Sequence, residues 1–168
     1  VREGRRRGGA ATSKAPVHRI GYLQGNKAQG AVRLFEVVPT VEPANVAERL
    51  ALASGTERKN IEVLIQGNVA GELQKGGVDA LETDRLAGRV SELDGLRLTG
   101  LMTMPPIGSP EDSRRWFAGL RQLRDRLQSR YPTLVHLSMG MSADFEGAME
   151  GGSAVFRVGR AVFGGRAT

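Results

Sequence analysis

A chain of 168 residues, of which 40% are apolar and 25% charged, is typical of a single globular domain with a substantial core. Cysteine is absent, which excludes disulfides and thiol chemistry and suits the reducing cytoplasm, where we expect the protein to be. No apolar run reaches the roughly 20 residues that span a membrane, so we expect no membrane partner. The net charge is +6, but arginines are not interleaved with aromatics, so we expect no nucleic-acid partner.

The chain begins with a basic segment, residues 1–15, which holds five basic residues and one acid. This segment supplies about four of the six positive charges, and it has no apolar core, so it is not a secretory signal. We therefore predict a basic, disordered tail over residues 1–15 and one domain over residues 16–168.

After the tail, short runs rich in β-branched residues alternate with helical patterns. The predicted strands are 18–22, 35–41, 61–69, 96–104, 134–141 and 154–159, and the predicted helices are 26–34, 44–54, 79–93, 111–130 and 144–150. The fourth helix has the clearest pattern, because Trp116, Leu120 and Leu123 recur at helical spacing. Just before it, Ser109 is a suitable N-cap and Pro110 suits the first turn.

Strands separated by single helices favour parallel pairing, because each crossover helix returns the next strand in the same direction. Two architectures fit this pattern, an open doubly wound sheet and a (β/α) barrel. No Gly-x-Gly-x-x-Gly turn follows the first predicted strand, which disfavours the dinucleotide-binding sheet. A TIM barrel has eight units in about 250 residues, so we predict an incomplete (β/α) TIM barrel with about six of its eight units. We expect a monomer whose open strand edges favour association.

Two strand ends near the C-terminus carry the strongest ligand signals. In GMSADFEGA, Ser142 stands where a helix N-cap belongs, and in FRVGRAVFG, Gly159 allows the backbone to approach a ligand closely. Consecutive parallel strands put like ends together, so we expect residues 138–142 and 157–160 to lie side by side around a phosphate-sized space. The alternative is that these are ordinary turn residues, since strand ends always meet turns.

Arg157 is unusual because it lies within an apolar strand. It has two interpretations: an ion pair at the edge of the sheet, or a buried cation directed at a ligand. The pattern alone leaves both open.

The segments HRIGYLQGNK, GLMTMPP and LSMGMSADFEGAMEGGS resemble the family of pyridoxal phosphate homeostasis proteins, which share the barrel of the alanine racemase N-terminal domain. The resemblance covers residues 17 to about 165. It implies binding of pyridoxal 5′-phosphate by a non-catalytic carrier or regulator of vitamin B6 homeostasis. It also implies that Ser142, with Ser138 near it, and the backbone of Gly159 and Arg160 hold the phosphate, and that Arg157 faces the pyridine nitrogen.

The chain departs from the family pattern in its lysines. Members begin with a strand ending in Ser-Lys, whose lysine forms the Schiff base, and this strand is not found here. The only lysines are Lys14, Lys27, Lys59 and Lys75, and Lys14 lies just before the first predicted strand rather than two strands upstream. We therefore expect the N-terminal part of the barrel to be missing. Arg160 also replaces the small residue that is usual in the family.

Two other functions stay open. A structural remnant of the barrel would bind no cofactor, as the missing lysine suggests. A racemase-like enzyme of the same fold would need a lysine base, commonly a tyrosine on the opposite face, and a second domain.

Overall fold

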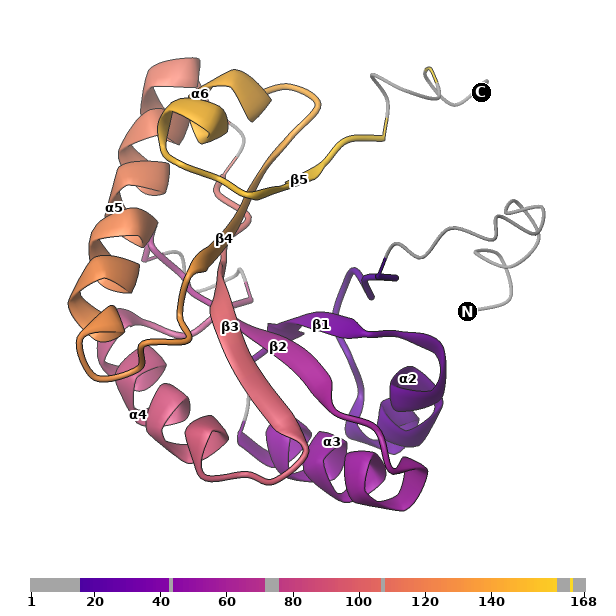
Figure 1. Ribbon diagram of the computed structural model, residues 1–168. Coiled ribbons are helices and arrows are strands. Elements are labelled where there is room, and N and C mark those ends of the chain that lie inside the picture. The colour runs from indigo at the N-terminus through magenta and orange to yellow at the C-terminus, as the bar shows by residue number, and fades with distance from the viewer. Residues whose placement is uncertain (1–15, 43, 72–75, 107, 160–163, 165–168) are drawn as a thin grey trace.

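The computed structural model describes residues 16–42, 44–71, 76–106, 108–159 and 164. Five parallel strands form one sheet in these residues: β1 (Val37–Val41), β2 (Ile61–Gln66), β3 (Leu96–Met102), β4 (His136–Met141) and β5 (Val155–Arg157). The spatial order of the strands is their order in the chain. The sheet is curved and open (Figure 1), so the predicted parallel, barrel-type arrangement is confirmed.

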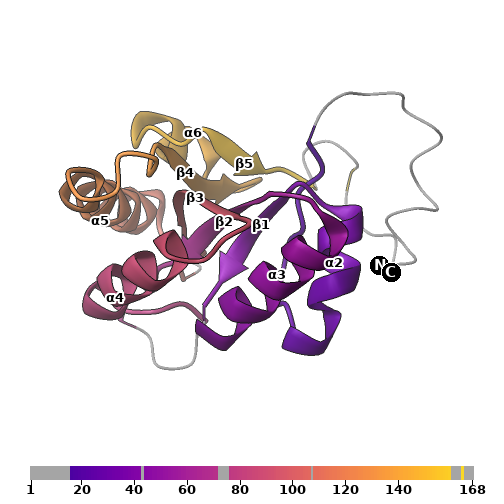
Figure 2. The same cartoon turned by 60° about the horizontal axis from the view of Figure 1, so that its bottom comes forward.

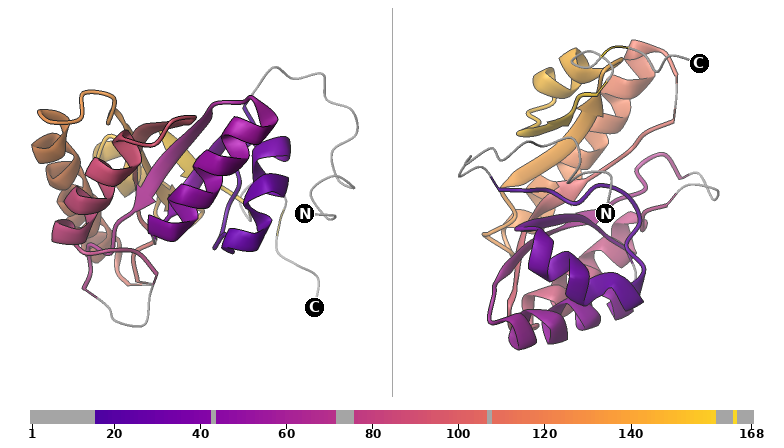
Figure 3. Two further views of the ribbon diagram at one scale, coloured as in Figure 1. Left: turned by 90° about the horizontal axis from the view of Figure 1, so that it is seen from below. Right: turned by 90° about the vertical axis from the view of Figure 1, so that its right-hand side faces the viewer.

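Helices connect the strands and follow one side of the sheet (Figures 2 and 3). They are the short 3-10 helix η1 (Gly25–Lys27), α2 (Ala28–Leu34), α3 (Ala44–Glu57), α4 (Ala80–Ser91), α5 (Pro110–Gln128) and α6 (Phe145–Glu150). Each of the five predicted helices is present. None of the described helices is both long enough and apolar enough to cross a membrane.

The first predicted strand, 18–22, is wrong as a strand. His18 forms only an isolated parallel bridge with Val37, supported by a hydrogen bond from the Arg19 N–H to the Val37 carbonyl at 2.9 Å. Beyond this point the Arg19 guanidinium binds two carbonyls of its own segment, and the backbone turns at Gly21, which has a φ of +94°. The described sheet therefore has five strands rather than six.

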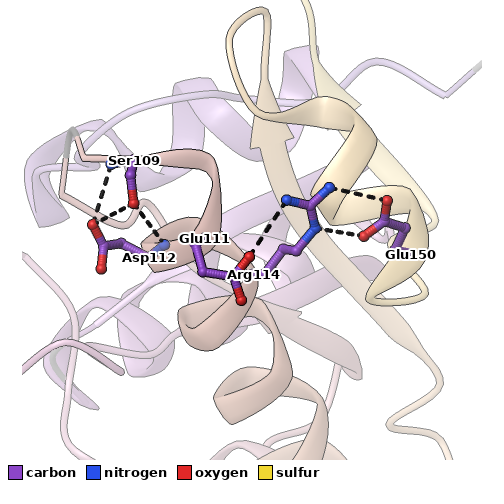
Figure 4. A network of polar contacts seen from close by, with 5 residues as sticks. All are labelled: Ser109, Glu111, Asp112, Arg114 and Glu150. Carbon is purple, nitrogen blue, oxygen red and sulfur yellow. Dashed lines mark hydrogen bonds and ion pairs between the residues drawn. The ribbon is translucent and has the colours of Figure 1, made fainter.

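The start of α5 shows how local sequence defines a helix end. Ser109 is the N-cap, and its hydroxyl accepts a hydrogen bond from the Asp112 N–H at 3.1 Å. The Asp112 carboxylate in turn accepts from the Ser109 N–H at 3.2 Å, which completes a capping box (Figure 4). The Ser109 hydroxyl also donates to this carboxylate at 2.7 Å, and this hydrogen bond, together with the one from the Ser109 N–H, holds the pKa of Asp112 below its ordinary value. The predicted cap at Ser109 and the first-turn proline are confirmed.

The main core fills the space between the sheet and the helices. Phe117 and Leu120 of α5 are fully buried in the same cluster as Leu137 and Met139 of β4. A second, smaller cluster consists of Val37, Leu64 and Met102. Since side chains alternate along a strand, Leu64 points away from its neighbours Val63 and Ile65, which belong to the main core. The opposite face of the sheet is therefore also partly apolar.

Neighbouring helices are joined on the outside by four arginine–carboxylate pairs, which we call the inter-helix ion pairs. They are Arg33–Glu57 (α2 to α3), Arg89–Glu48 (α4 to α3), Arg130–Asp84 (the turn after α5 to α4) and Arg114–Glu150 (α5 to α6). The last pair is bidentate, with N–O distances of 2.7 and 3.2 Å, and Glu111 lies 3.8 Å from the same guanidinium (Figure 4). Solvent and salt screen exposed pairs of this kind, so they align the helices more than they stabilise them.

Candidate functional site

The carboxyl ends of β4 and β5 lie side by side. In their parallel register Ser138 pairs with Val155, and Met141 pairs with Arg157. This confirms that residues 138–142 and the described part of 157–160 meet at one end of the sheet. Arg160, the fifth predicted site residue, lies outside the described residues.

A cavity of about 350 Å³ opens at this end of the sheet, a volume within the usual range for small-molecule sites. Its walls come from the carboxyl ends of β4 and β5, from the loops that follow β3, β4 and β5, and from the start of α5: Pro105, Pro106, Gly108, Pro110, Ser113, Met141, Ser142, Ala143, Asp144, Arg157 and Gly159. Three of the five predicted residues therefore line one cavity: Ser142, Arg157 and Gly159. A Cβ built at Gly159 meets no atom of the described residues within 4 Å, so on their side the cavity is open beside it.

The turn that follows β4 differs from its prediction. The N-cap of α6 is Asp144 rather than Ser142, and the helix begins at Phe145. The Asp144 carboxylate accepts a hydrogen bond from the Met141 N–H at 2.6 Å, which closes a turn over residues 142–144. Because the acid binds back to the strand end, the helix starts two residues later than a cap at Ser142 would allow. Ser142 lies within this turn, at the wall of the cavity.

Arg157 is a half-buried cation held by neutral oxygens. Its Nη1 donates to the Ser138 hydroxyl at 3.0 Å and to the Ser138 carbonyl at 3.3 Å, and its Nη2 donates to the Thr103 carbonyl at 2.8 Å. Its Nε is buried and has no hydrogen-bond partner among the described residues. No described carboxylate forms an ion pair with it, although the charge of Asp144 acts on it from a distance.

These surroundings decide between the two interpretations of Arg157. Burial lowers its pKa, and the negative charge of Asp144 partly opposes the shift. An arginine nonetheless remains protonated at neutral pH, because its ordinary pKa lies far above neutral. In the described structure Arg157 is a partly desolvated cation at the wall of a cavity, and not a member of an edge ion pair.

Ser138 occupies a different place from the other predicted residues. It is 1% exposed, and its hydroxyl accepts from Arg157 rather than lining the cavity. Thr103, whose carbonyl also holds Arg157, was not singled out by sequence reasoning. The one signal for Thr103 in the sequence is its position at the carboxyl end of a strand, where the ligand-binding residues of barrels lie.

The two described lysines lie away from the cavity walls. The Lys59 Nζ donates to the Phe35 carbonyl at 2.9 Å and pairs with Glu36 at 3.2 Å, at the amino ends of β1 and β2. Lys27 is exposed at the end of η1. Lys14 and Lys75 lie outside the described residues.

A parallel β/α sheet with a cavity at the carboxyl ends of its last strands, beside a desolvated arginine, has the architecture of a (β/α) barrel domain. The chain matches the family model described as "Alanine racemase, N-terminal domain" over residues 3–167. It belongs to this family.

Within this family, the chain is similar to one group of curated proteins. The chain is 40% identical over 151 residues to the pyridoxal phosphate homeostasis protein of Aquifex aeolicus, covering 89% of this chain and 66% of that protein. It is also 40% identical over 153 residues to the pyridoxal phosphate homeostasis protein of Escherichia coli K12, covering 89% of this chain and 64% of that protein. The predicted resemblance is confirmed, and the chain spans slightly less than two thirds of the length of these relatives.

Solved structures agree with this assignment. PipY of Synechococcus elongatus, solved with pyridoxal phosphate bound, superposes with a TM-score of 0.83 at 31% identity, covering 91% of this chain and 72% of PipY. Alanine racemase of Clostridium difficile superposes with a TM-score of 0.77 over 94% of this chain and 41% of the racemase. Its sequence is only 13% identical, so this second similarity concerns the fold alone.

Proposed function

We propose that the protein binds pyridoxal 5′-phosphate at the carboxyl ends of β4 and β5, as a non-catalytic carrier or regulator in cytoplasmic pyridoxal phosphate homeostasis. The observation that carries the proposal is the meeting of Ser142, Arg157 and Gly159 around one cavity of about 350 Å³. The names of the curated relatives and the cofactor in PipY support it.

The residues of the cavity suit the two ends of this cofactor. Ser142 offers a hydroxyl, and the open space beside Gly159 allows a phosphate to approach the backbone N–H groups there. The resemblance adds the backbone of Arg160 as a phosphate contact. Ser138 would serve the site through its hydrogen bond to Arg157.

Arg157 would face the pyridine ring. Bound pyridoxal phosphate supplies an electron sink through its ring nitrogen. A guanidinium donates hydrogen bonds but does not release a proton near neutral pH, so Arg157 would leave that nitrogen unprotonated. This arrangement favours holding the cofactor over using it in catalysis. No lysine is among the described residues that line the cavity, so the proposed contacts are noncovalent.

Titration with pyridoxal phosphate and, separately, with inorganic phosphate tests the proposal, followed by calorimetry and by cofactor absorbance. Ser142→Ala is expected to weaken both ligands by about 1–2 kcal/mol, the effect of one lost hydrogen bond to a charged group. Gly159→Val is expected to abolish binding, because its side chain would fill the space beside the phosphate. Ser129→Ala, at the far end of α5, serves as a matched control and should bind like the wild type.

Two results would contradict the proposal in different ways. Equal binding by the wild type and Gly159→Val would mean that the phosphate lies elsewhere. A wild-type protein that takes up neither ligand would favour a structural remnant of the barrel over a cofactor carrier.

A further inference from the structure

Thr103 connects the ends of four strands beside the cavity. It directly follows β3 and is 2% exposed. Its hydroxyl donates to the carbonyl of Gly67, just after β2, at 2.9 Å. Its N–H donates to the Ser138 carbonyl of β4 at 3.1 Å, and its own carbonyl accepts from Arg157 of β5 at 2.8 Å. The hydroxyl, the N–H and the carbonyl of Thr103 therefore all form hydrogen bonds to the ends of neighbouring strands.

The support of Arg157 depends on where Thr103 lies. Arg157 has no ion pair among the described residues, so its hydrogen bonds to the carbonyls of Thr103 and Ser138 and to the Ser138 hydroxyl fix its guanidinium. The Ser138 carbonyl also accepts from the Thr103 N–H. A displacement of Thr103 would therefore disturb both sets of acceptors at once.

The hydroxyl of Thr103 has a specific structural task. The loop beyond it contains Pro105 and Pro106, and prolines have no N–H with which to extend the hydrogen bonds of the sheet. At the start of this loop, the bond from the Thr103 hydroxyl to Gly67 ties the chain back to β2. The Thr103 hydroxyl thus provides a hydrogen bond to the neighbouring strand that the prolines of the following loop cannot donate.

We propose that Thr103 is a positioning residue, which fixes the guanidinium of Arg157 and so determines how firmly the site holds the ring of its ligand. This inference rests on the proposed function for the identity of the ligand. The positioning of Arg157 itself is a property of the ligand-free protein, and it can be measured there.

Three variants isolate the hydroxyl. Thr103→Val removes it with little change of shape, and Thr103→Ser keeps it. Thr83→Val is the matched control, because Thr83 is also buried and its hydroxyl donates to the Asp79 carbonyl at 2.6 Å, within α4 and away from the cavity walls. Urea unfolding of each variant gives its loss of stability, so binding is compared between variants of similar stability.

The first measurement is hydrogen exchange at the Nε of Arg157 in the ligand-free protein, followed by ¹⁵N NMR. The signal is assigned by its loss in Arg157→Lys, and the burial of this Nε predicts slow exchange in the wild type. In Thr103→Val we expect exchange about tenfold faster, the effect of losing one hydrogen bond of the support. Thr103→Ser and Thr83→Val should exchange like the wild type.

The second measurement is ligand affinity. Thr103→Val is expected to bind pyridoxal phosphate about threefold to tenfold more weakly, while inorganic phosphate, which does not need Arg157, binds unchanged. Unchanged exchange at Arg157 in Thr103→Val would overturn the inference, as would equal acceleration in Thr83→Val. If the wild type binds no pyridoxal phosphate, the proposed function fails, and the exchange measurement still decides the role of Thr103.

Discussion

We predict that Gly140→Ala strongly lowers the free energy of unfolding. Gly140 lies in β4, close to the candidate site. Gly140 has a φ of +92°, and a left-handed conformation costs a residue with a side chain about 1–2 kcal/mol. The new Cβ would lie 2.5 Å from the Cβ of Ala148 in α6 and 3.3 Å from the Cδ1 of Phe156. Overpacking of this kind costs about 1–3 kcal/mol. We therefore expect a loss of about 2–5 kcal/mol, a large fraction of the about 5–15 kcal/mol of a typical domain.

Urea unfolding followed by circular dichroism measures this loss. Gly119→Ala is the matched control, because Gly119 lies in the middle of α5 and, among the described residues, its added Cβ would meet only the Cβ of Val69, at 4.0 Å. Alanine is the better helix former, so this control is expected to gain about 0.5–1 kcal/mol. If Gly140→Ala unfolds at the same urea concentration as the wild type, the close approach of β4 to α6 is not as described.

Two further substitutions test the packing and the charges around α5. Phe117→Ala removes a fully buried side chain of the main core and is expected to cost about 3–5 kcal/mol in urea unfolding; a loss below about 1 kcal/mol would contradict its place there. Arg114 holds the pKa of Glu150 below its ordinary value of 4.5, so the pair stabilises the fold above this pH and its contribution disappears as the pH falls through the lower folded pKa. At pH 7, Glu150→Gln should therefore unfold at a lower urea concentration than the wild type. At pH values below the folded pKa of Glu150, the two proteins should unfold at the same urea concentration. A difference independent of pH would exclude this ion pair as its cause.

Local patterns in the sequence were sufficient to place most elements. The capping signal of Ser109 and the spacing of Leu120 and Leu123 define α5, since both depend on residues within a few positions of one another. The alternation of predicted strands and helices along the sequence implies that the strands pair in parallel and in chain order. For the same reason Arg157 and Met141 could be expected to meet, because consecutive parallel strands align their carboxyl ends.

The remaining features depend on contacts that no short pattern contains. The helix start at Phe145 follows from a side chain that binds backwards, from Asp144 to Met141, where a serine cap looked equally suitable. The segment at His18 has the composition of a strand but bends after one bridge. The link from Thr103 to Arg157 joins residues 54 positions apart through a backbone carbonyl, which any residue at position 103 would carry.

Each strand of the sheet pairs only with strands that are its neighbours in the chain. The inter-helix ion pairs follow the same rule, since three join consecutive helices and the fourth joins α4 to the turn after α5. An arrangement of this kind resembles a linear array of repeats, in which folding starts in any unit and spreads to the next. Contacts that close short loops also form faster than those between distant segments. The candidate site, where Thr103 connects the ends of β2 to β5, therefore forms once this consecutive part of the chain has folded.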